Sequence, residues 1–586
     1  MRQRRVLTAL AIPLALALVA ASCGSDDSSS DATTAPEDTT VTEDTTATED
    51  TTATEDTTAT EETTAPAETE TPVYGGSVSM GLEAEATGLR PWEDACSEPC
   101  YNIMISVYDP LMTNQGSGGY GPYLAESIEP NDDFTVWTMT LRPDITFHNG
   151  TPLTAQTIAD MFPIQQAGAQ SSGTIAAQGL TAVTAVDDLT VEYTLSAPNS
   201  AFPSALTFAP LGYPFDPAAA AADPTGYSTN PIGTGPFVMK SRDIDNETVV
   251  ERNPDYWRTD DDGNQLPYLD SISFRPIPDE GTRLDALLSG TVTAIESLRQ
   301  NTIRDAQEAG GDINVITASG NSTGGGMYNT QVPPFDDQRV RLGLNKMNDQ
   351  DRVIAALGGE GISLPSTQWF AADSPWWTQA AADSYPEFDF EGGTALIQEY
   401  VDDPARSDGK SPGDKIDVEL SCPPDPTLIA AMQVLEQVWS GSNLINVTLT
   451  QYDRATHINN AVSDTHKAHC WRWGGEGDPA AQVNPFVADS EISVANFPNY
   501  NDPEMQQWAA EASATADFET RKELYGKIMT RINEQAVLWY SGGTATLVAV
   551  EPNIQGISNW TLPSGELGVG TPSAEVRWQE VFVSDQ

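Results

Sequence analysis

The segment Asn230–Trp257 restricts the fold of this chain more than any other stretch. Its opening turn cannot be helical, because proline fixes φ and lacks an N–H, and glycine favours turns; the residues concerned are Pro231, Gly233, Gly235 and Pro236. Two apolar runs, Phe237–Met239 and Thr248–Val250, flank a polar Asn/Asp loop as the two strands of a hairpin would. No nucleophile stands beside a base here and no spacing suits a metal, so the segment predicts a structural hairpin.

The length and charge of the chain narrow its class. At 586 residues it is too long for one hydrophobic core, so two or three domains are expected. The formal charge of −57 argues against a nucleic-acid partner, because phosphates would be repelled rather than neutralised. It also disfavours adhesion to an anionic membrane surface.

Residues 1–22 have the layout of a secretory signal, with arginines before the apolar run Val6–Ala21. The run is shorter than the about 20 residues that a membrane-spanning helix needs. Small residues directly before Cys23 resemble a bacterial lipobox, in which the cysteine is acylated and becomes the mature N-terminus. We therefore expect a lipid anchor on the outer face of the cytoplasmic membrane, on the extracellular or periplasmic side. The alternative is an ordinary cleaved signal with a chance cysteine.

Residues 23–72 are predicted to form a disordered tether. They are rich in Thr, Glu and Asp and contain a hexapeptide repeat, TTATED, which begins at Thr45 and again at Thr51. Such a segment has no apolar surface to bury and cannot offset its ordering entropy, while its like charges repel one another. It should lift the folded body away from the envelope.

From residue 73 onward the pattern is that of an α/β protein. Val73–Met80 and Phe134–Arg142 alternate between apolar and polar residues, as half-buried strands do. Thr427–Trp439 has the periodicity of an amphipathic helix, and strands are predicted on either side of it at Ile416–Leu420 and Asn446–Thr450. Strands that alternate with helices favour an α/β fold.

Two stretches carry a resemblance to a known family. The first is P-I-G-T-G-P-F at 231–237 together with R-N-P-D-Y-W at 252–257, and the second is Y-N-T-Q-V-P-P-F-D-D-Q-R-V-R at 328–341. Both resemble signature segments of the family 5 extracellular solute-binding proteins, the peptide-type receptors of ABC importers. The resemblance extends from about Val73 to Gly556, which is nearly all of the folded chain.

The resemblance implies a periplasmic-binding-protein-like α/β fold with two lobes that close by a hinge. The first lobe is expected to be discontinuous and to carry an extra subdomain. The implied boundaries are 73–116, 190–300 and 541–586 for the first lobe, 117–189 for the extra subdomain, and 301–540 for the second lobe.

The stretch His466–Pro479 combines histidines, a cysteine, tryptophans and carboxylates more densely than any other part of the sequence, so it is the main candidate for a binding site. A metal could use His466, His469 and Cys470, but this compact run lacks a second, remote pair of ligands. The other interpretation is a strand that ends in a Gly-rich loop and presents side chains into a cleft.

The resemblance favours the cleft and implies a ligand site made of Trp473, Gly474, Glu476, Asn496 and Tyr540. In peptide-binding members a loop carboxylate pairs with the ligand's α-ammonium group, and this charge-assisted hydrogen bond fixes the ligand's register. Glu476 takes the place of that carboxylate, where the family has Asp, and the Tyr that follows it in the family is absent. A non-peptide ligand, or a Glu476 that merely faces solvent, therefore stays open as an alternative.

Four of the five cysteines remain to be assigned. Cys96 and Cys100 lie close together in one loop, and in an exported protein a disulfide between them is expected; zinc is the alternative, although no histidine is near. With Cys23 lipidated, the remaining two, Cys422 and Cys470, form the second pair in the simplest count, on or near the ends of adjacent strands. A free Cys470 is the alternative.

The function implied by the resemblance is capture, without chemistry. The protein would bind short peptides in a cleft by hinge closure and deliver them to an ABC permease and its ATPase, as a monomer without a cofactor. The same receptor could carry a non-peptide solute, such as an oligosaccharide, a chelated metal or an opine-like compound. A secreted hydrolase is a remote alternative, since no nucleophile–base pair or paired acid motif supports an enzyme.

Overall fold

The computed structural model describes residues 71–115, 119–474, 477–491, 493, 495–568 and 570–584. The chain divides into the units Met1–Thr69 and Glu70–Gln586, and all described residues belong to the second unit. The predicted signal peptide 1–22, the predicted lipidation site Cys23 and nearly all of the predicted tether therefore lie outside the described residues, as does Glu476. No helix in the described part of the chain is both long and apolar enough to cross a bilayer.

The main element is a ten-stranded mixed sheet with the order β14-β13-β15-β12-β16-β11-β1-β10-β9-β8. Strands β10 and β11 both pair parallel to β1, and β14 and β15 both pair parallel to β13, whereas the other neighbours are antiparallel. The strands are β1 (Ser77–Leu82), β8 (Phe237–Asp243), β9 (Glu247–Arg252), β10 (Ser271–Pro276), β11 (Ala294–Ser297), β12 (Asn314–Tyr328), β13 (Ile416–Cys422), β14 (Ile445–Gln451), β15 (Ala468–Gly474) and β16 (Leu538–Val550).

The predicted hairpin is confirmed by strands β8 and β9, which pair antiparallel with Phe237 opposite Arg252. The glycines of the preceding turn are required by a close approach of two backbones. A Cβ at Gly233 would lie 2.1 Å from the carbonyl oxygen of Val107, and one at Gly235 would lie 2.5 Å from its carbonyl carbon. The Pro/Gly turn is thus packed directly on the chain that leaves the first helix.

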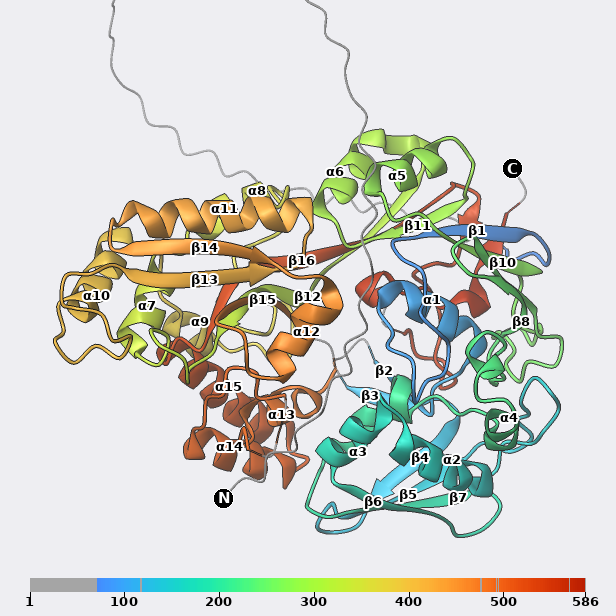
Figure 1. Cartoon of the computed structure of the whole chain (residues 1–586). Helices are drawn as coiled ribbons and strands as arrows, with labels where there is room; N and C mark the ends of the chain where they lie inside the picture. Colours follow the sequence, from blue (N-terminus) through green and yellow to red (C-terminus); the bar gives the residue numbers. More distant parts are fainter. Residues whose placement is uncertain are drawn as a thin grey trace, which may run out of the picture. The chain divides into compact units, whose positions relative to one another are not determined.

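The helices fall into two groups, and we use these groups to define two lobes. The first lobe comprises β1, β8–β11 and the helices α1 (Glu98–Val107), α2 (Ala155–Ala167), α3 (Ser171–Gln178), α4 (Pro217–Ala222), α5 (Glu280–Leu288) and α6 (Gln300–Ala309). The second lobe comprises β13–β15 and the helices α7 (Gln338–Lys346), α8 (Gln350–Ala356), α9 (Gln379–Ser384), α10 (Phe390–Val401), α11 (Pro426–Gly441), α12 (Arg454–Val462), α13 (Val483–Val487), α14 (Pro503–Ser513) and α15 (Phe518–Glu534). Figure 1 shows α11 running alongside β14 and β13, with which it is in contact.

A four-stranded antiparallel sheet with the order β4-β5-β7-β6 extends the first lobe. Its strands are β4 (Ala125–Pro130), β5 (Val136–Leu141), β6 (Leu180–Ala185) and β7 (Thr190–Leu195), and α2 and α3 pack beside them (Figure 1). This sheet includes β7, so the extra subdomain extends beyond the boundary at residue 189 that was expected from the sequence. The short strands β2 (Met112–Asn114) and β3 (Tyr120–Pro122) pair next to it in the chain.

Strands β12 and β16 belong to both lobes. Residues 314–319 of β12 pair with residues 545–550 of β16, whereas residues 323–327 pair with residues 538–543. Between these two ladders the register shifts, and it shifts again between Gly324 and Gly325. Beyond β16 the chain returns to the first lobe, where Trp560 and Trp578 enter the core and β17 (Ile554–Gln555) pairs with β18 (Phe582–Val583). The first lobe is therefore discontinuous, as predicted.

Candidate functional site

A cavity of about 760 Å³ is lined by residues of both lobes. The first lobe contributes the turn after β1, the beginning of α1 and the segment between β11 and α6, including Glu83, Glu98, Leu298 and Arg299. The second lobe contributes α8, α11, α12 and the strands β13, β15 and β16. Its volume lies within the range of about 300–1,000 Å³ that is typical of small-molecule sites.

Arg299 joins the two lobes at this cavity. Its Nη2 lies 2.6 Å from the Oε1 of Glu83 in the first lobe and 3.2 Å from the Oδ2 of Asp425 in the second. Asp425 also caps α11, because its carboxylate accepts the backbone N–H groups of Thr427 and Leu428. Burial alone would raise the pKa of Asp425, but the Arg299 charge and these hydrogen bonds hold it below its usual value.

A second ion pair crosses between the lobes. The guanidinium of Arg472, on β15, pairs with the carboxylate of Glu98, the first residue of α1. Both side chains keep partial access to solvent, which weakens the attraction. Together the two arginines connect the walls of the cavity from opposite lobes.

A buried carboxyl group lies behind the first-lobe wall. Glu296, on β11, is fully buried, and its Oε1 accepts the backbone N–H of Glu83 at 2.5 Å. Burial, followed by the nearby charge of Glu83, raises the pKa of Glu296 to about 7. The other carboxylate oxygen of each residue, Oε2, is buried and has no hydrogen-bond partner among the described residues.

The second-lobe wall is apolar and continuous with the core of that lobe. Met432 and Leu435 of α11, Val353 of α8 and Trp539 of β16 are almost fully buried and belong to one hydrophobic cluster. The half-buried Leu357 and Leu428 pack against this cluster and also line the cavity; Leu357 immediately follows α8 and Leu428 lies on α11. The indole Nε1 of Trp539 has no hydrogen-bond partner in the described part of the chain.

Three buried histidines form a cluster at the cavity, in which the rings of His457 and His469 are stacked. The rings of His457 and His469 lie 3.6 Å apart, and that of His466 lies 5.2 Å from His469. Because a carbonyl oxygen can only accept, the Nε2 of His469 donates to the carbonyl of His457, and its Nδ1 accepts from the Ser421 hydroxyl. Burial lowers the pKa of His466 to about 4 and that of His469 to about 2, so both are neutral near pH 7.

This hydrogen bonding contradicts the metal alternative for His466, His469 and Cys470. Both nitrogens of His469 are occupied and Cys470 is bonded to Cys422. No cluster of three or more metal-ligating side chains occurs among the described residues.

Both predicted disulfides are present. Cys96–Cys100 closes the loop at the start of α1. Cys422–Cys470 joins the end of β13 to the adjacent strand β15, and both of its cysteines line the cavity. The free Cys470 and the zinc alternative for Cys96 and Cys100 are therefore not found.

Of the sequence-predicted ligand residues, the four that the structure describes, Trp473, Gly474, Asn496 and Tyr540, do not line this cavity. Trp473 is 2 % exposed, packed between Trp369 and Phe486 in the core of the second lobe. The carbonyl of Gly474 accepts the indole N–H of Trp369, which places this backbone against the same core. Trp471, two residues earlier on the same face of β15, lines the cavity instead, because Trp369 covers only Trp473.

The two later residues serve the packing of the second lobe. The side chain of Asn496 donates to the carbonyls of Ala488 and Tyr500 and so holds its own loop. Tyr540 is fully buried, with its ring 5.1 Å from that of Tyr385. Beyond the undescribed Glu476, the chain is fixed by the buried ion pair of Asp478 with Arg521.

Sequence reasoning missed Arg299, Glu83 and the apolar wall. The apolar wall could have been predicted from the stretch 427–439, because it contains more apolar residues than a helix needs to pack against a single sheet. The pairing of Arg299 with Asp425 could not have been predicted, because the two residues are far apart in the sequence and meet only through the fold.

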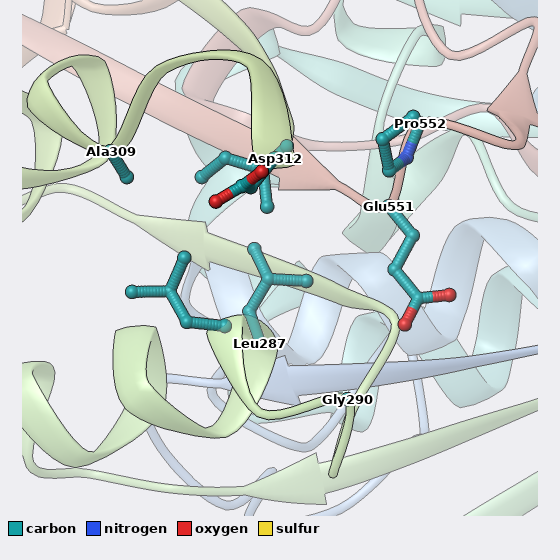
Figure 2. A pocket seen from close by; sticks show the side chains of 8 residues that line it. Leu287, Gly290, Ala309, Asp312, Glu551 and Pro552 are labelled. Atoms are coloured by element: carbon teal, nitrogen blue, oxygen red, sulfur yellow. The ribbon is translucent and has the colours of Figure 1, made fainter.

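A second hollow, of about 550 Å³, lies on the first lobe between α5, α6 and the end of β16. Figure 2 shows its wall, with Leu287, Asp312 and Pro552 around the opening and the carboxylate of Glu551 directed toward Gly290. Its lining contains neither a cation nor an aromatic ring, and all of it comes from the first-lobe side of the molecule. The cavity between the lobes is therefore the better candidate for a ligand site.

Comparison with known proteins agrees with this two-lobed arrangement. A family model described as "Bacterial extracellular solute-binding proteins, family 5 Middle" matches residues 119–493, more than half of the chain. The chain belongs to this family. Family 5 proteins are periplasmic or extracellular solute-binding proteins. The match confirms the resemblance given above, and the solved structures of this type confirm the predicted fold class.

Individual family 5 relatives cover most of the chain. Heme-binding protein A of Haemophilus influenzae is 26 % identical over 79 % of this chain and 85 % of its own length. The dipeptide-binding protein of Escherichia coli is 24 % identical over 76 % of this chain and 83 % of its own. The solved structure of the periplasmic binding protein DppA from Helicobacter pylori, in complex with the peptide STSA, superposes with a TM-score of 0.72 at 20 % identity, covering 88 % of this chain and 99 % of that one.

Proposed function

We propose that this family 5 protein is the extracytoplasmic receptor of an ABC importer and that it captures short peptides between its lobes. The observation that carries this proposal is the composition of the cavity wall, which comes from both lobes and is spanned by the Arg299–Asp425 and Arg472–Glu98 ion pairs. A ligand that touches both walls favours the closed form over the open one, so capture is a shift of population rather than a reaction.

The remaining parts of the importer follow from this role. The ligand-bound protein docks on a membrane permease whose ATPase drives uptake. The signal peptide 1–22 directs export and is removed; the acylated Cys23 and the tether 23–72 then hold the receptor at the outer face of the cytoplasmic membrane, where it acts as a monomer. Anchoring is tested by expressing the chain with Cys23→Ser: the wild type should fractionate with membranes and gain the mass of the lipid, and the variant should do neither.

A second candidate is the same receptor role for a non-peptide solute. The support is that the heme-binding relative is as similar to this chain as the dipeptide-binding relative is. A chelated metal, an opine-like compound and an oligosaccharide are the alternatives within this candidate. A hydrolase has no support from the family, whose members bind solutes.

Native mass spectrometry of freshly purified protein is the deciding experiment. If the lobes close over a ligand in a cavity of this size, the protein should retain that ligand through gentle purification, and the mass increment identifies the ligand class. Titration calorimetry with a peptide mixture and with an oligosaccharide mixture follows. Heat from the peptides alone supports the peptide receptor, whereas a retained non-peptide, or heat from the saccharides alone, replaces it with the second candidate.

A further inference from the structure

The charged groups that line the cavity already have partners within the protein. Arg299 is paired with Glu83 and Asp425, and Arg472 is paired with Glu98. A ligand charge would have to displace one of these pairs, and exchanging one ion pair for another yields little net free energy. Selectivity must therefore come largely from groups that are not already engaged in these ion pairs.

The apolar wall offers such groups. Leu428, Met432 and Leu435 recur at helical spacing along α11, so their side chains form one stripe facing the cavity. Leu357 continues this stripe from the neighbouring α8 end, and Trp539 of β16 belongs to the same hydrophobic cluster and also lines the cavity. The four side chains of the stripe, Leu357, Leu428, Met432 and Leu435, carry no nitrogen or oxygen atom, and a ligand group that covers them is favoured in proportion to its apolar area.

Two buried polar atoms of cavity-lining residues lack partners, and they are of opposite kind. The Nε1–H of Trp539, a residue only 3 % exposed, is a donor without an acceptor in the described part of the chain. The Oε2 of Glu83, on the other lobe, is an acceptor without a donor there. Buried polar groups are normally satisfied, so a ligand that supplies an acceptor and a donor would complete the site.

A peptide backbone carries both groups, a C=O acceptor and an N–H donor, beside each side chain. We propose, resting on the function given above, that the cavity selects short peptides with a bulky aliphatic or aromatic side chain. That side chain lies against the stripe of α8 and α11, the adjacent carbonyl accepts from Trp539 and a backbone or terminal N–H donates to Glu83. Saccharides lack the apolar group, and small polar peptides leave the wall uncovered.

The test is calorimetry of the purified full chain with four tripeptide sets, in which Leu, Phe, Gln or Ala occupies each position in turn among alanines. Burial of a Leu or Phe side chain should strengthen binding at least about tenfold over the Ala and Gln peptides at one position. Equal affinity across the four sets at every position overturns the side-chain proposal and leaves the peptide receptor standing. If no peptide binds at all, the proposed function itself fails, and this inference fails with it.

Matched variants locate the selectivity on the wall. Leu428→Gln should reduce the preference for Leu and Phe peptides at least about fivefold while the Ala peptide binds as before. The control is Leu444→Gln, since Leu444 is also half-buried against the same core cluster but does not line the cavity. If Leu428→Gln does not fold, Leu357→Gln takes its place, with the same expected loss of preference for Leu and Phe peptides. A preference unchanged in the folded variant overturns the proposal.

The hydrogen bond from Trp539 has its own variant. Trp539→Phe keeps an aromatic ring and removes the N–H, so it should weaken every peptide about five- to tenfold. Trp578→Phe is the control, because Trp578 is buried in the first-lobe core and its Nε1 also lacks a partner among the described residues. Equal affinities in the two variants would remove Trp539 from the site.

Discussion

The carboxylate of Asp109 accepts the indole N–H of Trp257 at 2.9 Å, although the two residues are 148 positions apart. The same carboxylate accepts the hydroxyl of Tyr256 at 3.0 Å. Asp109 follows α1, and Tyr256-Trp257 closes the segment from which the family resemblance was first drawn. Burial raises the pKa of Asp109 to about 6, while the two hydrogen bonds oppose this rise.

Asp109→Ala should lower the free energy of unfolding by about 2–4 kcal/mol, because the donors of Tyr256, Trp257 and Thr234 lose their acceptor. Urea unfolding near neutral pH measures the change. Asp255→Ala is the control, since Asp255 is exposed and should change stability by less than about 0.5 kcal/mol. Equal stability of the two variants would show that the Asp109 network contributes nothing.

Arg472→Ala should shift the ligand-free protein toward the open form. Loss of a partly exposed ion pair is worth about 1 kcal/mol, which is about a fivefold change in the ratio of open to closed molecules. Small-angle scattering measures this as a larger radius of gyration. Lys240→Ala, which breaks a pair within the β8–β9 hairpin, should leave the curve unchanged. Superimposable curves for Arg472→Ala and the wild type would contradict the role of the pair.

Glu296 should make the protein less stable as pH rises. Its pKa is about 7 when folded and near 4.5 when unfolded, so between these values the folded state binds the extra proton. Stability from this group is complete below about pH 4.5 and is lost as pH rises to about 7, by about 3 kcal/mol in total.

Glu296→Gln isolates this effect, because glutamine does not titrate. The difference in thermal midpoint between variant and wild type should move in favour of the variant from about pH 4.5 to 7 and level off above. A difference that stays constant over this range would show that the carboxyl group is not perturbed as described.

Removal of the Cys422–Cys470 disulfide should cost more stability than removal of Cys96–Cys100. The chain separations are 48 and 4 residues, and loop-closure entropy then gives about 4 kcal/mol for the first and about 2 kcal/mol for the second. Denaturant unfolding of the paired Cys→Ala variants under oxidising conditions measures both values. A reversed order would mean that strain or residual structure outweighs the entropy of the unfolded chain.

Glu476→Ala should weaken peptides that carry a free α-ammonium group and spare their N-acetylated forms. The expectation follows from the loop carboxylate of peptide-binding relatives, and its physical cause is the loss of a charge-assisted hydrogen bond. Calorimetry with each peptide and its acetylated counterpart gives the ratio directly. Unchanged affinity for the free peptide would remove Glu476 from the site.

The sequence contained enough information for the fold and for part of the site. The β8–β9 hairpin was predictable because Gly233, Gly235 and the flanking prolines leave the chain few conformations, and both glycines prove to lie against the backbone of Val107. The pairing of Cys422 with Cys470 was predictable because both cysteines were expected near the ends of adjacent strands, and the structure places those strands, β13 and β15, side by side.

The ligand-facing residues were harder, for a reason that Trp471 and Trp473 illustrate. Both lie on one face of β15, and local pattern does not distinguish them. Trp369, over a hundred positions away in the chain, covers Trp473 and leaves Trp471 at the cavity. Likewise, nothing near Glu296 in the sequence indicates that its carboxyl group lies beneath the turn at Glu83.

The slipped register between β12 and β16 determines where the molecule can bend. Both strands pass from one lobe into the other, and their ladders are regular on each side of residues 319–325. Any rotation of the lobes must therefore concentrate in that short glycine-containing interval, while the backbone hydrogen bonds above and below it stay intact. A substitution at Ser322 or Thr323 would change how easily the protein opens without altering the cavity lining, whereas Gly324 and Gly325 belong to both the bend and the cavity wall.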